Sequence, residues 1–223
     1  MTPLDQLLAL EDAGRAATAA DYHKAPRRYL GLAVPQVEEL VATWRAERDI
    51  AGRVALAAEL WDSDIHEARI AAAKLLTQAR MQPDDAVWAQ FLSWVPQFDA
   101  WAIADTACDV GSRRLLADPG RIDTVEGWTR DENKWVRRAA LVVTLPWAKM
   151  AFPKEPDLAI RARVLGWAAG YVPDRDWFIQ KSVAWWLRDL SKHDAQATRA
   201  FLAEHGPALK AFARKEAAKH LRD

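Results

Sequence analysis

The sequence predicts an all-α protein built from repeated helix pairs. The chain has 223 residues with only 9 glycines and 11 prolines, and it is rich in the helix-favouring residues Ala, Leu, Arg and Glu. A sandwich or barrel of short strands needs many turn-forming residues, so this composition disfavours those folds. Apolar residues recur at a spacing of three to four along much of the chain, which is the period of helices with one buried face.

One type of segment recurs along the chain and defines the repeat length. In it, a bulky or acidic residue opens a helix and leads into a run of small apolar residues. The segments open at Glu67, Trp101, Trp135, Phe178 and Phe212. Successive openings are 34 residues apart, except for a step of 43 between the third and the fourth. A period of this length is typical of two helices per repeat, as in tetratricopeptide, HEAT and armadillo arrays.

The repeat predicts a HEAT-like helical solenoid that forms a single domain over residues 1–223. Stacked repeats curve, so we expect a concave surface that can hold an extended ligand. The longer step contains the Pro-bearing stretch 146–156, which we predict to be a loop. Acidic residues that stand before the marked helices are expected to cap exposed backbone amides; they are Asp62, Asp64, Asp99, Asp131, Asp174 and Asp176.

The composition also disfavours several classes of protein and site. The apolar stretch Ala139–Leu145 has seven residues, whereas a membrane span needs about 20. Residues 1–11 carry two acids and no base, unlike a secretory signal, so we expect a cytoplasmic protein. The single cysteine, Cys108, is expected to pack in the core. The five histidines have no metal-ligand spacing and no phosphate-binding loop is present, so neither a metal nor a cofactor is expected.

Charge is unevenly distributed, although the formal net charge is zero. Residues 1–129 contain 13 Lys and Arg against 20 Asp and Glu, whereas residues 130–223 contain 18 against 11. The basic part suggests contact with a polyanion. The alternative is that the two oppositely charged parts attract each other or are simply solvated.

Alignment of the repeats places Asp105 where packing favours a small residue. The equivalent positions hold Ala71, Ala139, Ser182 and Glu216. A carboxylate in an apolar helix is costly to desolvate unless it is hydrogen-bonded or faces a cleft. Asp105 is therefore a candidate functional group. The alternative is that it only ties adjacent helices together.

The preceding position of the repeat holds three consecutive bases, Arg138, Lys181 and Lys215. Equivalent residues of successive repeats lie along one face, so this basic stripe suits a phosphate backbone. Arg138 is the strongest candidate for a fixed phosphate contact, because a guanidinium group can bind in a bidentate manner. Solvated surface charge is the alternative for each of the three.

Twelve tryptophans are an unusually high number for a chain of this size. Most are expected to pack in the core. Trp101 precedes Asp105 by four residues, which places the indole and the carboxylate on the same face of a helix. Trp185 and Trp186 point about 100° apart on a helix, so one of them is expected to be buried.

Four ordered motifs connect these candidates: Trp101-x-x-x-Asp105, Asp131-x-x-x-Trp135-x-x-Arg138, Phe178-Ile179-Gln180-Lys181-x-x-x-Trp185-x-x-Arg188, and Arg214-Lys215-Glu216-Ala217. Together they resemble the bacterial alkylpurine DNA glycosylases built from HEAT-like repeats, the AlkD family. The resemblance covers roughly residues 20–221, and Tyr22 stands where that family has an N-terminal aromatic residue. The chain departs from the family in Trp186, in a shorter N-terminal segment and in the stretch 146–156.

The resemblance implies a bacterial repair enzyme that removes N3- and N7-alkylated purines, such as 3-methyladenine and 7-methylguanine, from double-stranded DNA in the nucleoid. It implies that Asp105 is the catalytic carboxylate and that Trp101 and Trp185 flank the deoxyribose. The DNA-contacting residues are then expected to be Tyr22, Trp135, Arg138, Lys181, Arg188 and Lys215. An alkylated purine is cationic and leaves without a proton donor, so the chemistry needs only stabilisation of an oxocarbenium-like sugar and a positioned water.

Two further expectations complete this interpretation. We expect a monomer. The alternative function is a non-catalytic helical scaffold that binds DNA or protein, and it differs from the first in releasing no base from alkylated DNA.

Overall fold

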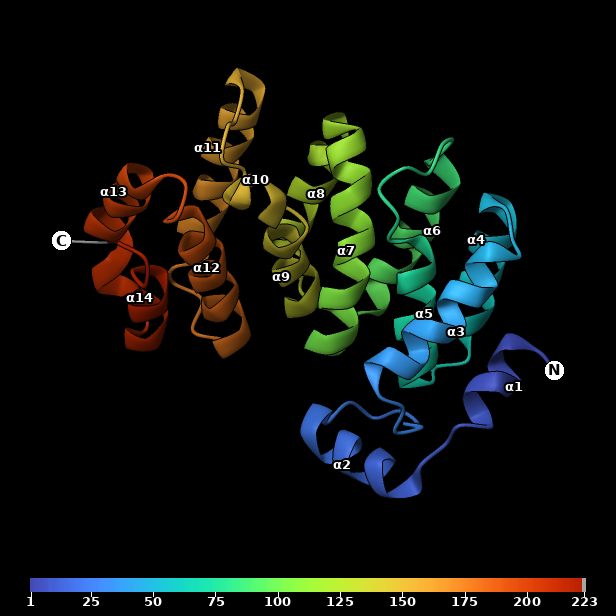
Figure 1. Ribbon diagram of the computed structural model, residues 1–223. Coiled ribbons are helices and arrows are strands. Elements are labelled where there is room, and N and C mark those ends of the chain that lie inside the picture. Colours follow the sequence, from blue (N-terminus) through green and yellow to red (C-terminus); the bar gives the residue numbers. More distant parts are fainter. Residues whose placement is uncertain (222–223) are drawn as a thin grey trace. The chain divides into compact units, whose positions relative to one another are not determined.

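The computed structural model describes residues 1–221, and this part of the chain is all-α, as predicted. Its only β-type pairing is an isolated bridge between Arg28 and Ile65. The chain divides into two compact units, and Figure 1 labels the helices of both. Unit 1 is Met1–Asp118, and unit 2 begins at Pro119. The expectation of a single domain therefore stays a prediction.

Unit 1 contains two packed layers of helices. Its elements are α1 (Pro3–Leu8), α2 (Ala13–His23), α3 (Val34–Ala46), α4 (Ile50–Asp62), α5 (His66–Leu76), α6 (Asp85–Trp94), the 3-10 helix η1 (Val95–Gln97) and α7 (Trp101–Ala117). Helix α5 packs against α3, α4 and α7, and α6 packs against α4 and α7. The helices α5 and α7 are thus neighbours in one layer, while α4 and α6 form the other.

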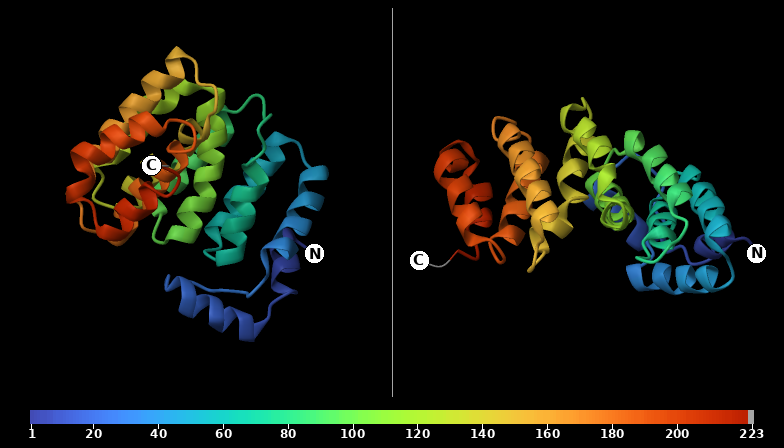
Figure 2. Two further views of the ribbon diagram at one scale, coloured as in Figure 1. Left: turned by 60° about the vertical axis from the view of Figure 1, so that its left-hand side comes forward. Right: turned by 90° about the horizontal axis from the view of Figure 1, so that it is seen from above.

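Unit 2 repeats this arrangement around α12, and Figure 2 gives two further views of its helices. Its elements are η2 (Pro119–Arg121), α8 (Ile122–Gly127), η3 (Trp128–Arg130), α9 (Lys134–Val142), α10 (Leu145–Lys149), α11 (Glu155–Gly170), α12 (Trp177–Leu190), α13 (Ala195–His205), η4 (Gly206–Ala208) and α14 (Ala211–Ala217). Helix α12 packs against α9, α10 and α14, and α11 packs against α13.

The repeat predicted from the sequence is confirmed at the level of helices. The marked helices α5, α7, α9, α12 and α14 begin within one residue of the predicted openings. Within each unit they are also neighbours, since α5 lies against α7, and α12 lies against both α9 and α14. Equivalent positions of neighbouring repeats are therefore adjacent in space.

The predicted loop at 146–156 is confirmed only for residues 150–154, and its two ends are helical. Residues Leu145–Lys149 form α10, and α11 already begins at Glu155. The prolines that suggested a loop, Pro146 and Pro156, lie in the first turns of these two helices. The missing amide hydrogen costs nothing there, because the first amides of a helix have no intrahelical acceptor.

The expected caps are confirmed only for α12, where Asp176 Oδ1 accepts a hydrogen bond of 2.7 Å from the backbone N–H of Phe178. Helix α9 is capped by Asn133 instead, and Asp131 accepts from the N–H of Asn133. The remaining caps were predicted wrongly: Asp62 ends α4, Asp64 and Asp99 pair with arginines, and Asp174 accepts from the N–H of Asp176. Nearby cations and adjacent amides compete for these carboxylates.

Half of the tryptophans pack in the cores of the two units, which is fewer than the majority expected from the sequence. The buried ones are Trp44, Trp61 and Trp94 in unit 1, and Trp147, Trp167 and Trp186 in unit 2. Trp61 and Trp94 stack with their ring centroids 4.4 Å apart, and this contact joins α4 to α6. Trp186 is fully buried and Trp185 is half-buried, so the prediction that one of this pair belongs to the core is confirmed.

Among the described residues, 1–221, none of the helices is both long and apolar enough to traverse a lipid bilayer.

Candidate functional site

The candidate carboxylate Asp105 lies in the second turn of α7, one turn after Trp101 at the start of that helix. Both side chains are half-buried, whereas Ala102, Ile103 and Ala104 between them are buried. The face that carries Trp101 and Asp105 is therefore the more open face of the first turns of α7. This confirms that the two residues share a face, which is the geometry expected for a spacing of four.

Trp101 borders an aromatic cluster that includes Tyr22. The Tyr22 ring meets the Trp101 ring edge to face, with the centroids 5.9 Å apart, although the two lie on α2 and α7. His23 lies 5.4 Å from Trp101, and His66 lies 4.5 Å from His23. Tyr29 stacks on His66 at 4.8 Å. Tyr22 is 68% exposed, so it forms the open edge of this aromatic cluster.

The histidines of the aromatic cluster are held neutral. Burial, together with the neighbouring His23 and Arg27, lowers the pKa of His66 to about 3. Burial also lowers the pKa of His23, against the opposing charge of Glu67. The Nδ1 atoms of both rings are buried without a hydrogen-bond partner within residues 1–221. These neutral rings therefore act as packing groups, and His23 contacts Trp101 directly.

The segment after α2 is fastened to α5 by a buried carboxylate. Glu67 accepts hydrogen bonds of 2.8 Å from the backbone N–H groups of Leu30 and Gly31. Gly31 has a φ of +75°, and a Cβ at this position would lie 2.4 Å from the backbone nitrogen of Ala16. Only glycine allows this approach, which holds α2 and its Tyr22 in place beside α5.

An arginine fixes the start of α7. The side chain of Arg27 is 1% exposed and forms ion pairs with Asp64 and with Asp99. Asp64 also pairs with Arg69 at 3.1 Å. Asp99 stands two residues before Trp101, so this network ties the opening of α7 to the turn between α4 and α5.

In unit 2, the half-buried indole of Trp185 is held by a buried carboxylate. Trp185 Nε1 donates a hydrogen bond of 3.0 Å to Asp189 Oδ2. Two cations lie near its ring centroid, Arg138 at 5.9 Å and Lys149 at 5.8 Å. Lys149 also pairs with Asp189 at 3.7 Å. The orientation of Trp185 is thus fixed by charge and hydrogen bonding, and not by apolar packing alone.

The structure places Arg138 inside unit 2, where it is 4% exposed. Its Nη1 donates a hydrogen bond of 2.8 Å to the carbonyl oxygen of Phe178, which links α9 to α12. Within unit 2 the guanidinium group therefore supports α12 and the Trp185 ring. A direct contact between Arg138 and phosphate stays a prediction.

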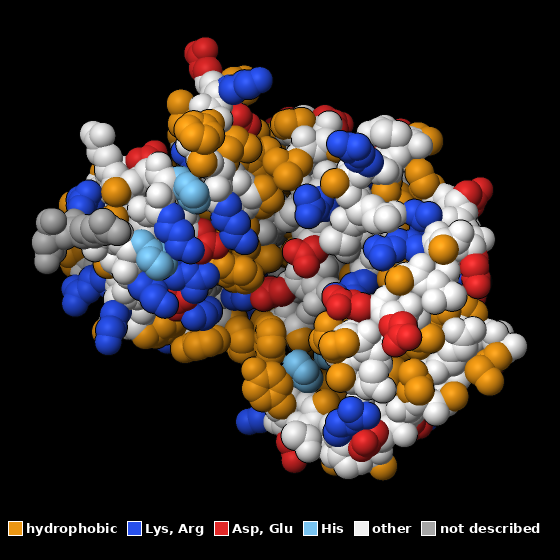
Figure 3. Space-filling view, in the orientation of Figure 1, with side chains coloured by type: hydrophobic (Ala, Val, Ile, Leu, Met, Phe, Trp, Pro, Cys, Tyr) orange, Lys and Arg blue, Asp and Glu red, His pale blue; other side chains and the backbone are white. Residues whose placement is uncertain are grey.

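The other predicted DNA-contacting cations share one hollow on unit 2. This hollow has a volume of about 720 Å³ and is lined by Lys181, Arg188, Phe212, Lys215, Glu216 and Lys219. Glu216 binds two of these cations, since it pairs with Lys181 and accepts a hydrogen bond of 2.7 Å from Arg188. Lys215 and Lys219 lie at the surface and form no ion pair within residues 1–221. Figure 3 shows the Lys and Arg side chains gathered over α12 and α14.

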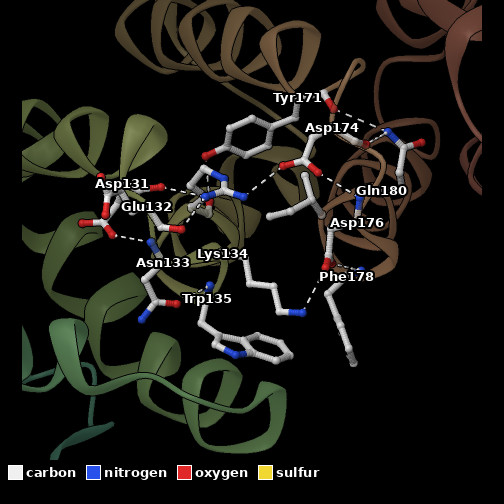
Figure 4. A network of polar contacts seen from close by, with 12 residues as sticks. Asp131, Glu132, Asn133, Lys134, Trp135, Tyr171, Asp174, Asp176, Phe178 and Gln180 are labelled. Atoms are coloured by element: carbon white, nitrogen blue, oxygen red, sulfur yellow. Dashed lines mark hydrogen bonds and ion pairs between the residues drawn. The ribbon is translucent and has the colours of Figure 1, made fainter.

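Trp135 lies in the first turn of α9 and contacts Phe178 in the first turn of α12, with the ring centroids 4.6 Å apart. Lys134 lies over both rings and pairs with Asp176 at 2.9 Å. Figure 4 shows these side chains together.

The same close-up shows how the openings of α9 and α12 are joined. Arg137 donates to the carbonyl oxygen of Asp131 and pairs with Asp174 at 3.1 Å. The buried amide of Gln180 donates to the carbonyl oxygen of Asp174 at 2.9 Å, and its oxygen accepts from the N–H of Lys210 at 3.0 Å. Gln180 therefore links the loop before α12 to the start of α14.

The chain matches, over residues 4–221, the family model described as DNA alkylation repair enzyme. This chain belongs to the DNA alkylation repair enzyme family. The match covers both units, and it confirms the family resemblance inferred from the four motifs. A search of curated protein sequences finds no match.

Solved structures share the fold of this DNA alkylation repair enzyme. A predicted DNA alkylation repair enzyme from Enterococcus faecalis has a TM-score of 0.79 at 20% identity, over 96% of this chain and 97% of that one. The protein smu.31 from Streptococcus mutans has a TM-score of 0.63 at 18% identity, over 85% and 93%. AlkD2 from Streptococcus mutans has a TM-score of 0.62 at 18% identity, over 86% and 92%.

Sequence reasoning missed several residues that position the candidate site of this DNA alkylation repair enzyme. Asp189 had a usable signal, because it follows Trp185 by four residues and so shares its helix face. His23, Tyr29 and His66 had none, because residues from α2, the following segment and α5 meet only in the folded chain. Arg27 likewise shows its role only through its contact with Asp99.

Proposed function

We propose that this DNA alkylation repair enzyme is a DNA glycosylase that hydrolyses the N-glycosidic bond of N3- and N7-alkylated purines in duplex DNA. The observation that carries this proposal is that Asp105 and Trp101 lie on the same open face of α7. The edge-to-face contact of Trp101 with exposed Tyr22 supports it, because it extends the aromatic surface beside the carboxylate.

The reaction needs few groups from the protein. The alkylated base carries a positive charge and departs as a neutral purine, so no general acid is required. The deoxyribose becomes oxocarbenium-like as the bond breaks, and a nearby carboxylate stabilises this cation electrostatically. Asp105 takes this role and accepts a hydrogen bond from the attacking water. The π face of Trp101 adds cation–π attraction of about 1–2 kcal/mol when desolvated.

Unit 2 supplies the remaining contacts in this proposal. Trp185 is the second aromatic group at the sugar. The hollow with Lys181, Arg188 and Lys215 contacts backbone phosphates and displaces the cations condensed on the DNA, so affinity falls with salt. Arg138 and Trp135 complete the proposed DNA contacts of unit 2, and Tyr22 adds a contact from unit 1. We further propose that the enzyme acts as a monomer on chromosomal DNA in the cytoplasm.

The test is the release of free base from methylated duplex DNA by the Asp105→Asn variant. We expect release of 7-methylguanine and 3-methyladenine to fall at least 100-fold, while the affinity for duplex DNA stays within about twofold, because the amide keeps the shape of the side chain but not its charge. Asp109→Asn is the matched control, because this exposed acid lies one turn further along α7. Its activity should equal that of the wild type.

The alternative, a non-catalytic scaffold, predicts a different result in the same assay. The wild-type protein would then bind duplex DNA with a steep salt dependence and release no base from it. Unchanged base release by the Asp105→Asn variant would reject the assignment of the carboxylate while leaving the glycosylase activity in place.

A further inference from the structure

Aromatic side chains at the openings of three successive marked helices of unit 2 form a continuous row. Trp135 contacts Phe178 at 4.6 Å between centroids, and Phe178 contacts Trp177 at 5.0 Å. Trp177 in turn stacks on Phe212 at 5.5 Å with an angle of 22° between the rings. The row, Trp135, Phe178, Trp177 and Phe212, thus spans α9, α12 and α14.

One inner member of this aromatic row, Trp177, is open to solvent. Trp177 is 49% exposed, unlike the tryptophans that form the core of unit 2. Leaving an indole face in water forgoes part of the free energy that its burial would contribute. An exposed indole that continues a row of half-buried rings is a candidate interaction site. Packing alone therefore does not account for Trp177.

Cations border the aromatic row on its Phe212 side. Phe212 also lines the hollow that contains Lys181, Arg188, Lys215 and Lys219. Lys215 and Lys219 are exposed and have no carboxylate partner within the described part of the chain. Figure 3 shows Lys and Arg side chains next to hydrophobic side chains on one face of unit 2. The surface thus offers flat rings and positive charge side by side.

We propose that this surface binds a segment of single-stranded DNA, with unpaired bases stacked on Trp177 and Phe212 and phosphates held by Lys215 and Lys219. Aromatic platforms beside a basic groove are the features that bind unpaired nucleic acid without sequence preference. Duplex DNA already stacks its bases on one another, so it cannot use the exposed ring faces. An acidic peptide could use the cations but would gain little from stacked rings.

This inference goes beyond the proposed glycosylase function, because it involves neither Asp105 nor a damaged base. Binding of an undamaged strand and release of an alkylated base are measured separately, so either proposal can fail without the other. The Asp105→Asn variant of the full chain should bind the single strand as tightly as the wild type.

The experiment measures the fluorescence anisotropy of a fluorescein-labelled strand of twelve thymidines titrated with the full chain at low salt. Trp177→Ala and Phe212→Ala should each weaken binding about tenfold, since stacking contributes on the order of 1–3 kcal/mol per base. Phe152→Ala is the matched control, because Phe152 is 92% exposed in unit 2 and lies outside the aromatic row. It should leave the affinity unchanged.

Two further measurements separate stacking from charge and from misfolding. Trp177→Phe keeps a π face and should recover most of the affinity lost in Trp177→Ala, with the same thermal unfolding midpoint as the wild type. Lys215→Gln and Lys219→Gln should each reduce the slope of log K against log salt by about 0.7. The proposal is overturned if both alanine variants bind the single strand like the wild type, or if Phe152→Ala weakens binding equally.

Discussion

The indole nitrogen of Trp185 donates a 3.0 Å hydrogen bond to Asp189, and the same carboxylate pairs with Lys149 and Arg188. A half-buried aromatic side chain is thereby held in one orientation by a carboxylate that is 4% exposed. An aromatic group that must face a deoxyribose benefits from such positioning, because a rotamer that is already fixed costs no ordering entropy on binding.

The Asp189→Ala variant tests this positioning. Removing the carboxylate leaves the indole N–H and nearby cations without their partner, so we expect the free energy of unfolding to fall by about 1–3 kcal/mol in urea titrations. Base release should also fall. The Trp185→Ala substitution should then reduce base release less in the Asp189→Ala background than in the wild type. The exposed Glu204→Ala serves as the control, and additive effects of the two substitutions would contradict the coupling.

Trp101 is expected to act on the reaction more than on binding. Trp101→Ala should slow base release roughly 5- to 30-fold, which corresponds to the cation–π attraction of about 1–2 kcal/mol, while undamaged duplex DNA binds as before. Trp101→Phe should reduce the rate of base release less than Trp101→Ala does. Trp177→Ala is the control, because that exposed indole belongs to the aromatic row of unit 2. A loss of duplex affinity that matches the loss of rate would instead assign Trp101 to binding.

Gly31 is expected to be indispensable for the placement of α2. In Gly31→Ala, the new Cβ would meet backbone atoms at the start of α2, including Asp12 O of its N-cap at 2.5 Å, and the residue would keep a φ of +75°. We expect a loss of at least about 1–3 kcal/mol of stability from the strained backbone, measured by urea unfolding. Gly127→Ala, where nothing lies within 4 Å of the new Cβ, should be neutral or slightly stabilising.

The buried His66 predicts a loss of stability in acid. Its pKa is lowered from 6.5 to about 3 in the folded chain, so below pH 6.5 the unfolded chain binds a proton that the folded chain does not. Stability should therefore decline as the pH falls from 6.5 towards 3, with a contribution of at most about 1.4 kcal/mol per pH unit.

The His66→Phe variant checks this assignment, because it keeps a ring in the aromatic cluster but cannot bind the proton. Its free energy of unfolding should fall less steeply between pH 6.5 and 4 than that of the wild type. His193→Phe changes an exposed histidine and should leave the slope as it is. An identical slope in His66→Phe and the wild type would show that other groups cause the acid sensitivity.

Much of the fold follows from the sequence because helices depend on local spacing. The openings at 67, 101, 135, 178 and 212 each mark a helix start to within one residue, and the family assignment based on the motifs is confirmed. The wrong predictions concern residue types that can take either of two structural roles. A proline such as Pro146 can end a helix or begin one, and an acid such as Asp99 can cap a helix or pair with a distant arginine.

The candidate site was predicted less completely, because most of its supporting contacts are long-range. The spacing of Trp101 and Asp105 on one helix was sufficient to place them on one face. No local pattern could bring Tyr22 to Trp101, because that contact depends on Gly31 and Glu67 fastening α2 to α5. The functional roles of these residues stay predictions.

The sequence by itself determined the helical class, the repeat length and the residues that share a helix face, since a period of 3.6 residues is a property of the local backbone. Only the tertiary structure decided that Trp186 is buried while Trp185 is held by Asp189, and that Arg138 lies beneath the surface of unit 2. Burial and partner choice depend on which helices pack together. That packing joins residues far apart in the chain, and no local spacing encodes it.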